Sequence, residues 1–156
     1  LAGVGLAEQQ ELNFAFTGTT GYATVSRFPP SSTDPSSLLK FDTATGAPDT
    51  GFYVSQAQLP TPIFALASVG GSLYAAASRV PVSNIGYGLF LARLHGSSGA
   101  PDTTFSQPSV TVNAPTHVLA TTGTDLWAGG DFTRYRGGRG NYFIPINPQT
   151  GASADP

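Results

Sequence analysis

The sequence predicts an all-β fold built from three copies of one unit, and two observations support this prediction. First, residues 38–52, LLKFDTATGAPDTGF, return as residues 91–105, LARLHGSSGAPDTTF, and again in shorter form as residues 143–152, FIPINPQTGA, at spacings of 53 and 52 residues. Second, the 156 residues include 19 Gly and 13 Pro, which favour many turns and short strands over long helices. A period near 50 residues with short β-like segments is typical of propeller blades.

Each unit is expected to begin with a short inner strand, a glycine turn and a second strand. In copies two and three these are expected at residues 65–68 and 118–121, at Gly70 and Gly123, and at residues 73–78 and 126–131. The first copy aligns at an offset of 52, which places Gly18 on Gly70 and residues 22–27 on residues 74–79. Three copies therefore account for the chain, with approximate boundaries at 1–60, 61–113 and 114–156 in a single propeller segment, 1–156.

A third strand is expected at residues 88–94 and 142–147, and a weaker fourth strand at residues 109–113. Four antiparallel strands make one propeller blade. Between the third and fourth strands, Asp42-x-x-Thr45-Gly46 and Asn147-x-x-Thr150-Gly151 predict hairpin loops, since a short acceptor side chain opens the turn and Gly closes it with a positive φ.

Neither histidine is predicted to be catalytic or metal-binding. His95 occupies the position of Asp42 and Asn147, so we expect it to start a hairpin, and its spacing to Ser97 and Ser98 does not match a nucleophile elbow. His117 has no carboxylate near it in sequence, and the Asp residues form no closely spaced calcium-binding loop. We therefore expect no metal, no cofactor and no enzymatic activity.

The composition disfavours several classes of partner. The net charge is −2 and Lys40 is the single lysine, which argues against nucleic acid and anionic membrane surfaces because both need a basic field. The absence of Cys excludes a disulfide framework. No apolar run approaches the roughly 20 residues of a membrane-spanning helix. The chain has no Met and begins Leu1-Ala2-Gly3, so we expect a piece of a longer protein rather than a processed one.

One Gly-rich loop concentrates three of the seven basic residues and is the candidate binding site. Arginines hold carboxylates and phosphates through forked hydrogen bonds, and tyrosines add stacking surface. The alternative is a solvated connector, like residues 80–87 in copy two. The candidate residues are Arg134, Tyr135, Arg136, Arg139 and Tyr142.

The unit resembles the delta-60 repeat family of bacterial β-propeller proteins. The resemblance is carried by residues 91–94, LARL, residues 101–105, PDTTF, and residues 128–133, AGGDFT. It implies a closed ring, usually of about six to eight blades, in an exported or cell-surface bacterial protein. Copy one departs from the pattern, because residues 26–28 read SRF where GDF is expected. Three copies cannot close such a ring.

An arc of three blades leaves two blade faces without a neighbour, so inter-blade residues such as Leu73, Tyr74, Leu126 and Trp127 would contact water there. Tyr22, Tyr74 and Trp127 align on the second strand and are expected to pack between blades. The partners expected are the remaining blades of a longer chain, or copies of this chain, with two copies making six blades.

The function expected is therefore a non-enzymatic structural or recognition module that mediates protein–protein contacts. The alternative is a lectin-like propeller that binds glycans between blades, which requires the same aromatic and polar residues at each pocket. An enzyme with a site in the central channel ranks lower, because the inner strands offer mostly Ala, Leu, Ser and Thr.

Overall fold

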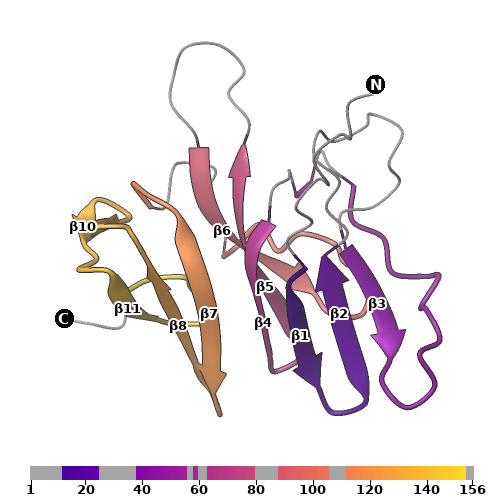
Figure 1. Ribbon diagram of the computed structural model, residues 1–156. Helices are drawn as coiled ribbons and strands as arrows, with labels where there is room; N and C mark the ends of the chain where they lie inside the picture. The colour runs from indigo at the N-terminus through magenta and orange to yellow at the C-terminus, as the bar shows by residue number, and fades with distance from the viewer. Residues whose placement is uncertain are drawn as a thin grey trace, which may run out of the picture.

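The computed structural model describes residues 12–24, 38–55, 58–59, 63–79, 88–105 and 112–153. Within these ranges the chain forms antiparallel strands and turns and no helix (Figure 1). The predicted all-β class is therefore confirmed. In this part of the chain there is accordingly no helix with the length and apolar character needed to cross a membrane.

In the described residues, nine strands form three antiparallel sheets, one for each copy of the sequence repeat. Sheet 1 contains β1 (Phe14–Thr17), β2 (Thr20–Thr24) and β3 (Leu38–Asp42); sheet 2 contains β4 (Ile63–Val69), β5 (Ser72–Arg79) and β6 (Gly88–His95); sheet 3 contains β7 (Thr116–Thr122), β8 (Asp125–Gly130) and β11 (Phe143–Ile146). In each sheet the second strand lies between the other two. A separate hairpin joins β9 (Arg134–Tyr135) to β10 (Gly138–Arg139).

The strand register repeats with the sequence. Opposite each aromatic residue of the second strand lies the equivalent residue of the third strand: Tyr22↔Lys40, Tyr74↔Arg93 and Trp127↔Pro145. The first and second strands also pair as the sequence alignment requires, with Ala67 opposite Tyr74 and Ala120 opposite Trp127. The first three predicted strands of the unit are confirmed in copies two and three.

The predicted fourth strand is not formed in the described residues. After each hairpin turn the chain returns to the third strand through a single bridge: Phe41↔Pro48, Leu94↔Pro101 and Ile146↔Ser153. Proline has no N–H to donate, so Pro48 and Pro101 cannot extend the ladder. Most of the range 109–113 lies outside the described residues, and Val112 forms a bridge with Tyr135 instead. Within the described residues each sheet thus has three strands, and the expected fourth strand stays a prediction.

The predicted hairpin turns are confirmed. Asp42 Oδ1 accepts hydrogen bonds from the Thr45 backbone N–H at 2.8 Å and from the Thr45 hydroxyl at 2.8 Å, and Gly46 has a φ of 72°. Asn147 Oδ1 accepts from the Thr150 N–H at 3.1 Å. His95 holds the same position through its backbone, because its carbonyl accepts the Gly99 N–H at 2.8 Å.

The three sheets stack face to face, and two apolar cores fill the spaces between them (Figure 1). The first strands lie next to one another, β1 beside β4 and β4 beside β7. Alternation along β5 divides its side chains between the two cores. Leu73, Ala75 and Ala77 belong to the core with sheet 1, and Tyr74 and Ala76 to the core with sheet 3.

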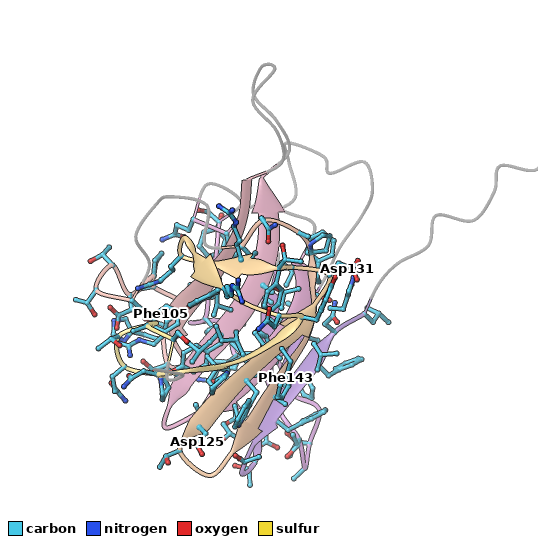
Figure 2. The ribbon with its side chains drawn as sticks, turned by 90° about the vertical axis from the view of Figure 1, so that its left-hand side faces the viewer. Phe105, Asp125, Asp131 and Phe143 are labelled. Atoms are coloured by element: carbon cyan, nitrogen blue, oxygen red, sulfur yellow. The ribbon has the colours of Figure 1, made fainter. Side chains whose placement is uncertain are left out.

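This stacking corrects the expectation about which residues face water. Leu73, Tyr74 and Leu126 are at most 1% exposed because each lies in a core between two sheets. Trp127 was expected to pack between blades, but it is only half-buried, stacked on the exposed ring of Phe143 at 5.0 Å. No sheet lies beyond sheet 3 in the described residues, and Figure 2 looks onto this side of sheet 3, where Phe143 lies at the surface.

Candidate functional site

The contact between neighbouring sheets is built around a buried tyrosine on the second strand. The Tyr22 hydroxyl donates to the Gly96 carbonyl of sheet 2's hairpin turn at 2.9 Å, and the Tyr74 hydroxyl donates to the Pro148 carbonyl of sheet 3's turn at 2.9 Å. Both donors and both acceptors occupy equivalent positions of the repeat. Burial raises the pKa of each tyrosine, so both remain protonated donors at neutral pH.

Each of these tyrosines also packs on the phenylalanine of the Asp-Thr-x-Phe segment in its own repeat. The Tyr22 and Phe52 ring centroids are 5.7 Å apart, and those of Tyr74 and Phe105 are 5.4 Å apart. Such tilted and edge-to-face pairs stabilise a core beyond the area that they bury. The repeated Phe of the sequence motif therefore positions the tyrosine that links neighbouring sheets.

Arg93 joins sheet 2 to sheet 3 and was not singled out by the sequence. Its Nε donates to Asp102 at 2.9 Å, and its Nη1 donates to the carbonyls of Pro148 at 2.7 Å and Gln149 at 3.0 Å. Hydrogen bonds from Thr104 and from Arg93 hold the pKa of Asp102 well below its usual range. The guanidinium also lies over the Phe105 ring, 5.5 Å from its centroid.

The equivalent pair in sheet 1 remains at the surface. Lys40 contacts Asp49 at 2.7 Å, but the two side chains are 19% and 40% exposed, against 10% and 12% for Arg93 and Asp102. In sheet 3 the corresponding third-strand residue is Pro145, which carries no charge. The same position of the repeat therefore carries an exposed ion pair in sheet 1 and a buried ion pair that reaches the next sheet in sheet 2. In sheet 3 it carries an uncharged proline.

The predicted binding loop forms a tight hairpin. β9 and β10 pair Arg134 with Arg139, and the two-residue turn is Arg136-Gly137, with φ values of 48° and 84°. Positive φ at both central residues is the geometry of the commonest two-residue hairpins. Glycine takes the second of these positions without steric cost, which is a signal that sequence reasoning could have used.

Two of the five candidate residues are part of the packing. Tyr135 is 3% exposed, its hydroxyl donates to the Gly151 carbonyl at 2.5 Å, and burial raises its pKa to about 12. Arg136 Nη2 donates to the Phe105 carbonyl at 2.6 Å and so links the hairpin to the preceding repeat. These contacts make Tyr135 and Arg136 structural in the isolated chain.

The other three candidates are exposed. Arg134 and Arg139 lie opposite each other and border an open hollow of about 360 Å³, which is also lined by Thr133, Gly137, Gly138 and Asn141. Tyr142 is 61% exposed and has a φ of 66°, an uncommon value for a bulky residue. Two forked guanidinium groups beside each other can hold a carboxylate or phosphate. Whether this hollow binds a ligand stays a prediction.

The structure adds a histidine–carboxylate pair that the sequence did not indicate. Antiparallel pairing of β7 with β8 brings His117 Nε2 to 2.9 Å from Asp131 Oδ2, although the residues are 14 positions apart. Both side chains are more than half exposed. His117 also borders a hollow of about 410 Å³ together with Leu12, Asn13, Phe64 and Pro115.

Asp125 is the first residue of β8 and Asp131 directly follows its last residue; both are labelled in Figure 2. Within the part of the chain that the structure describes, His117 and Asp131 have no third His, Cys, Asp or Glu beside them that would complete a metal-binding group. The contact with Asp131 therefore orients the imidazole ring of His117 at the surface. The signal that could have found it is the hairpin pairing implied by the predicted first and second strands.

Two comparisons with known proteins gave no match. No protein-family model matches the chain, and no curated protein matches it.

Proposed function

We propose that this chain is a non-enzymatic scaffold, a three-blade segment of a β-propeller that mediates protein–protein contacts. The observation that carries the proposal is the contact between sheets, which is made twice with the same parts. In both copies a buried tyrosine packs on the repeat phenylalanine and donates to the turn of the next sheet. A contact that repeats in this way generates an array of stacked sheets, as in propellers and solenoids.

The likeness to delta-60 repeats remains part of the proposal, and with it the location in an exported or cell-surface bacterial protein. The three-stranded sheets are compatible with blades whose outermost strand is reduced to a bridge. Rigid stacked sheets present loops at fixed positions, which suits a recognition role. The hollow beside Arg134 and Arg139 is the surface of this scaffold that we assign to an acidic partner group.

The aromatic residues of the second strands give little support to the lectin-like alternative. Glycan sites between blades need exposed aromatic platforms at each repeat, but Tyr22 and Tyr74 are 3% and 1% exposed and already use their hydroxyls between sheets. Only the third position, Trp127, reaches solvent. This distribution indicates that the aromatic position of the second strand serves packing between sheets rather than glycan binding.

Deletion of residues 114–156 tests the scaffold proposal. The deletion would uncover Tyr74, Ala76 and Leu91, which lie in the core between sheets 2 and 3. We expect the remaining chain to lose its cooperative thermal transition, because each sheet buries its apolar faces on its neighbours. An unchanged, independent transition in the remainder would contradict the proposal.

A further inference from the structure

We propose that two copies of this chain dock head to tail, with the outer face of sheet 3 in one copy packed on the outer face of sheet 1 in the other. The outer face of sheet 3 consists of Val118, Ala120, Trp127, Phe143 and Pro145, and the outer face of sheet 1 of Phe14, Phe16, Ala23, Leu39 and Phe41. The inference rests on the proposed scaffold function, since it extends the same contact between sheets to a second molecule.

Exposed apolar surface is concentrated on these two faces. Phe14, Phe16 and Leu39 are 50%, 59% and 48% exposed on sheet 1, and Val118 and Phe143 are 56% and 60% exposed on sheet 3. Figure 2 looks onto the sheet 3 side of the molecule, where Phe143 lies at the surface. Contiguous apolar patches of this kind on a folded domain mark interaction surfaces.

The repeat identifies what covers such faces elsewhere in the molecule. The outer face of sheet 3 is equivalent to the side of sheet 2 that packs on sheet 3, with Val118, Trp127 and Phe143 at the positions of Ala65, Tyr74 and Leu91. Those three residues of sheet 2 are at most 4% exposed. A face at these positions is thus covered by the opposite face of another sheet of the same kind.

The outer face of sheet 1 is the other half of that interface. Its residues Ala23, Leu39 and Phe41 stand at the positions of Ala75, Ala92 and Leu94 on sheet 2, which belong to the core with sheet 1. The outer face of sheet 3 and the outer face of sheet 1 therefore correspond to the two faces that meet between sheets 1 and 2 and again between sheets 2 and 3. A second copy supplies both halves, and an association through two different faces is heterologous.

The surroundings of the hairpin turns differ in the same way among the described residues. A Cβ at Gly99 would meet the Tyr53 carbonyl at 2.8 Å, and one at Gly151 would meet the Phe105 ring at 3.1 Å, because the preceding repeat packs against each turn. At Gly46, the equivalent position in sheet 1, no atom of the described residues lies within 4 Å. Among the described residues, the space that a preceding repeat occupies in copies two and three therefore has no occupant in copy one.

None of the residues that define the two faces carries a charge. Pro145 stands where sheet 2 has Arg93 and sheet 1 has Lys40, so the sheet 3 half lacks the cation of the other copies. Interface cores are depleted of charged residues and enriched in aromatic ones. Trp127 also retains a ring N–H at the position where Tyr22 and Tyr74 donate to the neighbouring turn.

Association is measured by sedimentation and by the emission of Trp127, the only tryptophan of the chain. Interfaces of standard size have dissociation constants in the micromolar range or below, so the chain should be associated at a concentration on the order of 100 μM. We then expect a mass of at least twice 16.0 kDa. Dilution should return the mass to 16.0 kDa and shift the Trp127 emission to longer wavelength. A mass of 16.0 kDa at every concentration overturns the proposal.

Charged substitutions on each face identify the surfaces. Phe16→Asp on sheet 1 and Val118→Asp on sheet 3 should each weaken self-association at least about tenfold, because a charge would be buried without a partner. Tyr53→Asp, an equally exposed aromatic outside both faces, should leave the association unchanged. Loss of association in Tyr53→Asp, or its retention in either face variant, overturns the assignment of the faces.

Mixing the two face variants tests the head-to-tail arrangement. Phe16→Asp retains an intact sheet 3 face and Val118→Asp an intact sheet 1 face, so the mixture should form a heterodimer through one repaired interface. Misfolded variants could not give this rescue. A mixture that stays monomeric overturns the arrangement. If the chain is monomeric but unfolds cooperatively, the docking inference fails and the scaffold survives; if the sheets unfold independently, the scaffold proposal itself fails.

Discussion

Replacing Arg93 with Ala tests the link between sheets 2 and 3. Arg93 is 8% exposed and makes hydrogen bonds to Asp102 within its own repeat and to Pro148 and Gln149 in the next. Its removal leaves the Asp102 carboxylate, 12% exposed, without a cation. Breaking a buried ion pair costs about 3–5 kcal/mol, and the bonds that Asp102 keeps from Thr104 reduce this, so we expect a loss of about 2–3 kcal/mol.

Lys40→Ala is the matched control, because Lys40 stands at the same position of the repeat in sheet 1. Its pair with Asp49 is exposed, so water screens it, and we expect a loss several times smaller. Urea unfolding followed by far-UV circular dichroism measures both variants. With a denaturant slope of about 2 kcal/mol/M, Arg93→Ala should lower the midpoint by about 1–1.5 M. Equal losses for both variants, or a loss below about 0.5 kcal/mol for Arg93→Ala, would refute the reasoning.

Three further predictions concern the third repeat. Because the pKa of Tyr135 is about 12 when folded and near 10 when unfolded, stability should fall as the pH rises from about 10 to 12, and Tyr135→Phe should flatten that fall in unfolding curves. Gly130→Ala would place a Cβ 2.1 Å from a backbone oxygen, so we expect a loss of about 2 kcal/mol or more, while Gly138→Ala, whose nearest neighbour is at 3.5 Å, should lose less than about 1 kcal/mol. Arg134→Ala with Arg139→Ala should leave the thermal midpoint unchanged or slightly higher, since two like charges face each other there; a marked drop would mean that they hold the hairpin in place.

The sequence was sufficient to predict the fold class and most strands because the same local pattern is present three times. A glycine turn between two short apolar segments predicts a hairpin at each copy, and the copies check one another. The fourth strand, expected at residues 109–113, stays a prediction, because most of that range lies outside the described residues. Val112, which is described, forms a bridge with Tyr135 of the third copy.

The site could be predicted only in part, because the decisive contacts join residues far apart in sequence. Arg93 reaches Pro148 across 55 positions, and whether it does so depends on how closely sheet 3 stacks on sheet 2. Within the basic loop, alternation along β9 leaves Arg134 exposed and buries Tyr135, which the composition of the loop did not distinguish. The pair His117–Asp131 follows from strand register, which is set by tertiary pairing.

Pulsed hydrogen exchange across a urea series, read by mass spectrometry on peptides from β2, β5 and β8, tests the central claim most directly. Each peptide reports one sheet, and the claim is that the three sheets are stabilised by one another through shared cores. The account predicts a single midpoint common to all three peptides. Separate midpoints, one for each sheet, would contradict it, because they would show that the sheets fold without the contacts that join them.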